Sequence, residues 1–176
     1  MNSKILTTHV GSLPRSKELS EIIFSKDKKE LFDEKKFESL IKKNVDEVVR
    51  RQIDLGIDII SDGEMSKISY ATYIKERVSG FSGESERRAP ADLDEFPEYK
   101  NKIAKSGGTP IYTRPCCTGE LKIFNENLLI QDIDNLLNSI ATHQHELAFM
   151  NAASPGVINV FMPVSYTHLR AHETKR

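Results

Sequence analysis

The sequence has few of the features that mark several broad classes of protein. It has no tryptophan and two cysteines, which are adjacent (Cys116 and Cys117), and its net charge is −1 from 25 basic and 26 acidic side chains. Adjacent cysteines build no disulfide framework, which favours a reducing, cytoplasmic setting. The balanced charge argues against a dedicated nucleic-acid-binding protein. No apolar run approaches the roughly 18 residues of a membrane span, so we expect neither nucleic-acid nor membrane partners.

What remains is the composition of an ordinary globular domain. The 176 residues are 38% hydrophobic and 29% charged, which suits about one domain with a real core. The clearest element is a helix with apolar residues at i, i+3, i+4 and i+7, for which Asp33 is a suitable N-cap and Gly56 a suitable C′ residue. The other predicted elements are strands at 5–8, 57–61, 113–118 and 148–153, helices at 17–24 and 130–147, and a long loop at 80–108 with a helical turn near 94–105.

Strands alternating with helices predict a parallel α/β sheet, in which ligands bind at the carboxyl ends of the strands. His9, Gly11 and Ser12 follow the first predicted strand, and Glu64 follows the second. From these residues alone other readings stay open. Gly11-Ser12 is also typical of an ordinary turn, Glu64 of a solvated loop carboxylate, and His9 of a structural hydrogen-bonding group.

Four motifs in order make the sequence recognisable: TTHVGSLPR at 7–15, RRQIDLGIDIISDGE at 50–64, RPCCTG at 114–119 and FMNAASPG at 149–156. Together they resemble the cobalamin-independent methionine synthase family, in its short single-barrel branch. The resemblance implies a (β/α)8 TIM barrel that transfers a methyl group from a methylated folate, or another donor, to the thiol of homocysteine. A zinc ion in the full-length protein would hold that thiol as a thiolate.

The resemblance implies roles for only a few residues. Gly11 and Ser12 match the Gly-Ser pair at the carboxylate end of homocysteine, and Glu64 matches the Glu that receives its amino group. His9 and Arg15 stand beside the first motif and are possible site-adjacent residues without an assigned role. We assign no catalytic residue in this chain.

No residue of the chain is assigned as a metal ligand. Neighbours on a strand point to opposite faces, so Cys116 and Cys117 do not suit one metal ion, and we expect them to be small buried apolar groups. His143 and His145, two apart on a helix, share no face. The family's zinc set comprises a His-x-Cys pair, a Glu and a further Cys, and no His-x-Cys occurs here. We therefore expect no tight zinc binding by this chain.

The length limits how much of a barrel can be present. A (β/α)8 barrel needs about 250 residues, so we expect a truncated TIM barrel with the first three to four β/α units in residues 1–163. Residues 164–176 resemble the translation of a transposase-type sequencing adapter, and we expect them to be a non-native tail. The spacing of His168 and His172, which imitates a metal-binding helix face, therefore carries no functional weight.

These observations favour a methyltransferase fragment that is inactive as given. An alternative is a fragment of a related thiol or corrinoid-linked methyltransferase. An alternative of another class is a small α/β module that binds an anionic metabolite without catalysis.

Overall fold

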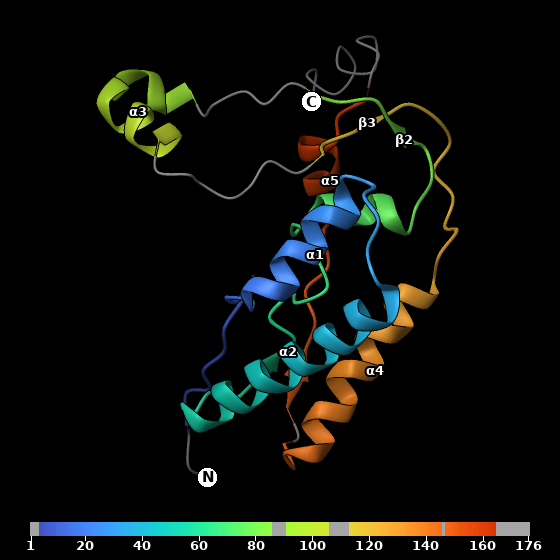
Figure 1. Cartoon of the computed structure of the whole chain (residues 1–176). Helices are drawn as coiled ribbons and strands as arrows, with labels where there is room; N and C mark the ends of the chain where they lie inside the picture. The colour runs from blue at the N-terminus through green and yellow to red at the C-terminus, as the bar shows by residue number, and fades with distance from the viewer. Residues whose placement is uncertain (1–3, 86–90, 106–112, 146, 165–176) are drawn as a thin grey trace.

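The computed structural model describes residues 4–85, 91–105, 113–145 and 147–164, which form a mixed α/β structure (Figure 1). No helix within these ranges is both long and apolar enough to cross a membrane. The helices are α1 (Lys17–Asp27), α2 (Glu34–Asp54), α3 (Pro97–Lys105), α4 (Asn127–Thr142) and α5 (Pro155–Phe161), with 3-10 helices η1 (Thr72–Glu76) and η2 (Ala91–Glu95). The strands are β1 (Ile60–Ser61), β2 (Phe81–Ser82), β3 (Cys116–Cys117) and β4 (Ala148–Phe149).

The boundaries of α2 follow from local capping, as the sequence predicts. The side chain of Asp33 accepts a hydrogen bond from the backbone N–H of Lys36 at 3.0 Å, which satisfies one free donor of the first turn. At the other end Gly56 adopts φ +75°, the left-handed conformation that ends many helices. Helix α1, capped by Ser16, runs to Asp27, three residues beyond the predicted end.

A small parallel sheet lies beside α2, and it carries the strand ends from which the site is built. In it Ile60 pairs with Ala148 and Ser61 with Phe149, and Thr8 adds a parallel bridge to Ile59. The parallel pairing confirms the predicted sheet, although each strand is shorter than predicted. The predicted strand at 5–8 is reduced to that bridge, because Ile5 is 88% exposed and buries too little surface to hold the segment in a ladder.

The predicted strand at 113–118 is not a third parallel strand. Its central part, β3, pairs antiparallel with β2, which lies inside the segment predicted as a loop. Gly80 makes the close crossing between the two chains possible: a Cβ there would lie 2.7 Å from the carbonyl oxygen of Glu120. The parallel sheet therefore runs from the Thr8 segment through β1 to β4, and the described residues show no barrel closure.

The C-terminal part of the described chain contains one helix that the sequence reading missed. The sequence analysis predicts no element after the strand at 148–153, but the Ser154 hydroxyl accepts a hydrogen bond from the backbone N–H of Val157 and caps α5. Pro155 occupies the first helical position, where its fixed φ is favourable. Val164 bridges to Cys117, and residues 165–176 lie outside the described residues.

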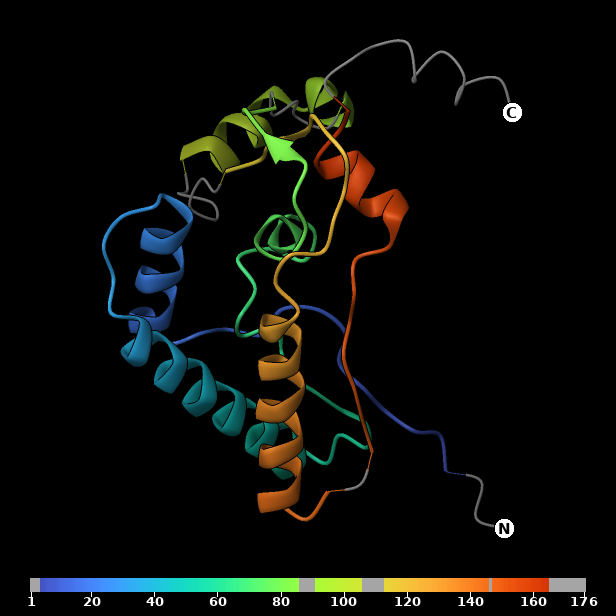
Figure 2. The same ribbon diagram turned by 90° about the vertical axis from the view of Figure 1, so that its right-hand side faces the viewer.

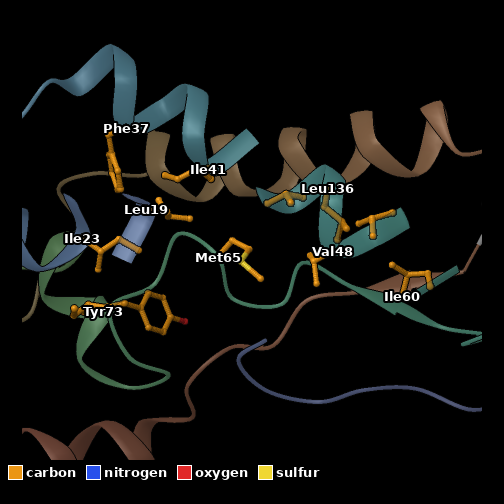
Figure 3. Close-up of a cluster of buried hydrophobic side chains, with 12 residues drawn as sticks. Leu19, Ile23, Phe37, Ile41, Val48, Ile60, Met65, Tyr73 and Leu136 are labelled. Carbon is orange, nitrogen blue, oxygen red and sulfur yellow. The ribbon is translucent and has the colours of Figure 1, made fainter. Parts of the chain in front are cut away.

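The hydrophobic core lies between α1, α2 and β1 (Figure 3). The apolar face of α2 supplies much of it, and Leu19 and Ile23 of α1 and Ile60 of β1 pack against that face. Helix α4 lies along α2 (Figures 1 and 2) but buries little more than Leu136. Ile140 is partly buried against the core, whereas four other large apolar side chains of α4 are exposed, namely Leu129, Ile130, Ile133 and Leu137.

Candidate substrate site at the strand ends

Loops that follow Thr8, β1 and β4 meet at the carboxyl-terminal edge of the parallel sheet. The backbone N–H of Leu13 donates to the carbonyl of Gly63 at 3.0 Å, which joins the first two loops. The Ser12 hydroxyl donates to one carboxylate oxygen of Glu64. The side-chain amide of Asn151, from the loop after β4, lies 3.4 Å from the other oxygen. The structure thus brings Ser12 and Glu64 together and adds Asn151, which the sequence analysis did not select.

Glu64 has an unusual backbone conformation. It is 3% exposed and its φ is +57°, directly after Gly63 at +60°. A non-glycine residue in this region is strained by roughly 1 kcal/mol or more and persists only where its surroundings fix it. The next residue, Met65, supplies part of that fixation, since its side chain inserts into the core cluster (Figure 3). Such strain at a buried carboxylate is typical of functional sites.

Arg15 fixes the backbone of the same loop. Its Nη2 donates to the carbonyl oxygens of Glu64 at 2.7 Å and Lys67 at 2.6 Å, and its Nε donates to that of Met65 at 3.2 Å. Burial lowers the pKa of the Arg15 guanidinium, while the nearby charges of Glu64 and Asp62 partly offset this. Because all these hydrogen bonds go to carbonyl groups, Arg15 shapes the loop rather than binding the Glu64 carboxylate.

A second pair of charges lies behind the Glu64 loop. Asp62 Oδ2 and Lys67 Nζ are 3.8 Å apart, and both side chains are almost completely buried. Burial raises the pKa of Asp62, and the positive charge of Lys67 opposes that rise. The Asp62 carboxylate also accepts the backbone N–H of Glu64 at 3.1 Å, so it helps to hold the left-handed turn.

The loops border an open pocket of about 470 Å³. Its lining includes Gly11, Glu64, Tyr70, Tyr73 and residues 149–154. Gly11 has φ +103°, which only glycine adopts easily. Among the described residues, no hydrogen bond uses the backbone N–H of Gly11 or Ser12. The pocket lining therefore combines the Glu64 carboxylate with Gly11, whose backbone N–H has no partner among the described residues.

The remaining candidates lie apart from this arrangement. The Nε2 atom of His9 is buried without a hydrogen-bond partner in the part of the chain that the structure describes, and nothing gives it a role. His143 Nε2 lies 3.0 Å from Asp46 Oδ1, and His145 Nε2 lies 2.9 Å from the carbonyl oxygen of Asp58. Both histidines therefore serve contacts between α4 or the segment after it and other parts of the fold.

The described residues offer no site for a metal ion. They contain no group of three or more His, Cys, Asp or Glu side chains that could hold one. Cys116 and Cys117 are free thiols and half-buried, less buried than we expected. His168 and His172 lie outside the described residues.

Polar loops gathered at the carboxyl ends of parallel strands place this chain among α/β folds in which ligands bind at that edge of the sheet. Residues 5–115, more than half of the chain, match the family described as "Cobalamin-independent synthase, Catalytic domain". The chain belongs to this family. The matched segment contains Gly11, Ser12, Arg15 and Glu64, and ends before Asn151.

Comparison with individual proteins agrees with this membership. The chain is 31% identical over 75 residues to a probable 5-methyltetrahydropteroyltriglutamate–homocysteine methyltransferase of Schizosaccharomyces pombe. It is 33% identical over 78 residues to the corresponding methyltransferase of Haemophilus influenzae strain PittEE. Each match covers 43% of this chain and 10% of the relative. The chain therefore spans only a small part of these relatives.

A solved structure supports the fold. The B12-independent methionine synthase from Shewanella sp. W3-18-1, solved in complex with selenomethionine, superposes with a TM-score of 0.60 at 16% identity. The superposition covers 91% of this chain and 41% of that chain. Most of the described fold thus corresponds to part of that enzyme.

Proposed function

We propose that this chain carries the amino-acid-binding part of a homocysteine methyltransferase. The observation that supports this most is that Ser12 and Asn151 both contact the buried carboxylate of Glu64, which lines a pocket. This carboxylate is buried, and no lysine or arginine side chain in the described part of the chain bonds to it, so it suits a cationic partner. The α-amino group of an amino acid is such a partner.

The opposite end of the same ligand would meet the first loop. The α-carboxylate needs donors, and the backbone N–H groups of Gly11 and Ser12 have no partner among the described residues. An amino acid bound between this loop and Glu64 has its side chain free to extend along the pocket past residues 149–154. This orientation would present the thiol of homocysteine away from both charged ends.

In the whole barrel, the reaction we propose is methyl transfer from 5-methyltetrahydropteroyltriglutamate to that thiol, as the names of the relatives state for them. The family resemblance implies a zinc ion at the thiol, but the described residues provide no ligand set that fits it. The role of this chain's own residues is to bind and orient the amino-acid end, and correct orientation contributes substantially to catalysis.

Calorimetric titration of the chain with homocysteine tests the proposal, with 4-mercaptobutyrate, which lacks the amino group, as the matched ligand. We expect Glu64→Gln to weaken homocysteine binding by roughly 10- to 100-fold, because a charge-assisted hydrogen bond contributes about 1.5–3 kcal/mol and each 1.4 kcal/mol is a factor of ten. It should leave 4-mercaptobutyrate unaffected. Glu38→Gln, an exposed change on α2, is the control.

Two outcomes would contradict the proposal. Equal homocysteine affinity in the Glu64→Gln variant and the unchanged chain would remove Glu64 from the site. Equal affinity for homocysteine and 4-mercaptobutyrate would instead indicate a pocket that recognises only the anionic end, which is the non-catalytic metabolite-binding alternative.

A further inference from the structure

Lys67 is a fully buried cation that the binding role described above does not use. Its side chain is 2% exposed, and its Nζ donates to the backbone carbonyl of Asn151 at 2.9 Å. The ammonium also lies 3.8 Å from Asp62 Oδ2 and 5.2 Å from the centre of the Tyr73 ring. Removing a lysine charge from water is unfavourable unless partners of this kind compensate for it. These partners therefore fix where the ammonium lies.

The contacts of Lys67 connect two loops that are distant in sequence. Lys67 belongs to the segment after β1, which also carries Glu64, and Asn151 belongs to the loop after β4. The backbone of Asn151 is held by Lys67, and the side chain of Asn151 reaches back to Glu64 Oε1. Lys67, Asn151 and Glu64 thus form a closed network of contacts, here called the Lys67 circuit, in which the position of the Asn151 amide depends on Lys67.

We propose that Lys67 is a positioning residue that holds Asn151 against Glu64 and so fixes the orientation of the carboxylate in the pocket. The inference rests on the proposed function for its consequence in ligand binding. The positioning of Asn151 by Lys67 does not depend on any ligand.

The circuit explains why both oxygens of Glu64 are constrained. Ser12 donates to one oxygen and Asn151 to the other, and only the second of these donors depends on the loop after β4. Without the bond from Lys67, the carbonyl of Asn151 loses its cationic donor and the loop is free to move away from the β1 side. The carboxylate would then keep Ser12 and lose its second donor.

The first test is a double-mutant cycle in the full chain. We expect Lys67→Met to weaken homocysteine binding by about 10-fold, and Asn151→Ala to weaken it by a similar factor. If Lys67 acts through Asn151, the double variant should bind about as well as the Asn151→Ala variant alone. Multiplying losses in the double variant would refute the inference. Lys26→Met, which removes a half-buried ion pair with Glu76, controls for general destabilisation.

The second test needs no ligand. We expect the side-chain amide signals of Asn151 in a nitrogen–proton NMR spectrum to shift, and their hydrogen exchange to accelerate, in the Lys67→Met variant but not in the Lys26→Met variant. Unchanged Asn151 signals would overturn the positioning role. If the unchanged chain binds no homocysteine, the proposed function fails. The NMR result still decides whether Lys67 positions Asn151.

Discussion

Gln52 allows the stability of the site's scaffold to be tested at one side chain. It is 4% exposed on the inner face of α2. Its Oε1 accepts the backbone N–H of Ser61 at 3.1 Å, and its Nε2 donates to the carbonyl of Ser61 at 2.8 Å. The amide thus pairs with both backbone groups of one residue of β1, as a neighbouring strand would. Ser61 directly precedes the Asp62-Gly63-Glu64 turn.

Replacing Gln52 by Leu keeps the approximate shape but removes both partners of Ser61. A buried backbone group left without a partner costs about 1–3 kcal/mol, and the added apolar contact of Leu offsets a part of this. We expect the free energy of unfolding to fall by about 2–4 kcal/mol. For a chain of this size that corresponds to a drop in Tm of roughly 5–15 °C.

Urea unfolding followed by circular dichroism measures this change, with Lys43→Ala as a control on the exposed side of the same helix. Lys43 makes a long, exposed ion pair with Glu47, so its replacement should change the free energy by less than about 0.5 kcal/mol. Hydrogen exchange should accelerate at Ser61 in the Gln52→Leu variant. A loss below about 0.5 kcal/mol for Gln52→Leu would refute the view that this amide substitutes for a strand.

Three further predictions concern other parts of the chain. Hydrogen bonds from Lys4 and Thr7 lower the pKa of Asp58 from 3.8 to about 2. The stabilisation from this carboxylate is therefore present above pH 3.8 and is lost as the pH falls through about 2. Thermal melts across this range should show a weaker dependence of Tm on pH for the Asp58→Asn variant. Gly63→Ala should lower the free energy of unfolding by about 1–3 kcal/mol in urea titrations, because its Cβ would lie 3.1 Å from that of Leu13 at φ +60°. Equilibrium dialysis of the chain against zinc should show no tight stoichiometric binding, and one tightly bound ion per chain would contradict our assignment of no metal ligands.

Local signals in the sequence were sufficient for α2, but they placed α4 at 130–147 instead of Asn127–Thr142 and missed α5. Asp33 and Gly56 mark the ends of α2 because capping depends on residues within one turn. The pairing of strands depends on distant residues, and the sequence predicted the parallel pair of β1 and β4 but not the antiparallel pair of β2 and β3. The run at 113–118 has strand character, but its antiparallel pairing with β2 depends on a segment far away in the sequence, which approaches closely at Gly80. Residues 5–8 likewise have strand character without the packing that would extend the ladder.

The candidate site was partly accessible from the sequence. Ser12 and Glu64 follow predicted strands and match a family motif, and the structure brings them into contact. Their ligand-binding role stays a prediction. Asn151 also follows a strand, and the same rule about strand ends could have selected it. No sequence pattern selects Lys67. Only the fold reveals that this lysine, in a polar segment, is buried against the carbonyl of a distant residue.

At position 64, folding stability and ligand binding favour different residues, because Glu64 adopts a left-handed backbone conformation. By backbone energy alone, glycine is the residue that fits best at a φ of +57°, and Glu64→Gly would relieve roughly 1 kcal/mol of strain. The same change removes the only carboxylate that faces the pocket from this loop. A library of variants selected for folding should therefore enrich glycine at this codon, while a library selected for ligand binding should retain glutamate. The difference in glycine frequency at position 64 between the two libraries reports the stability that the fold loses by keeping a carboxylate there.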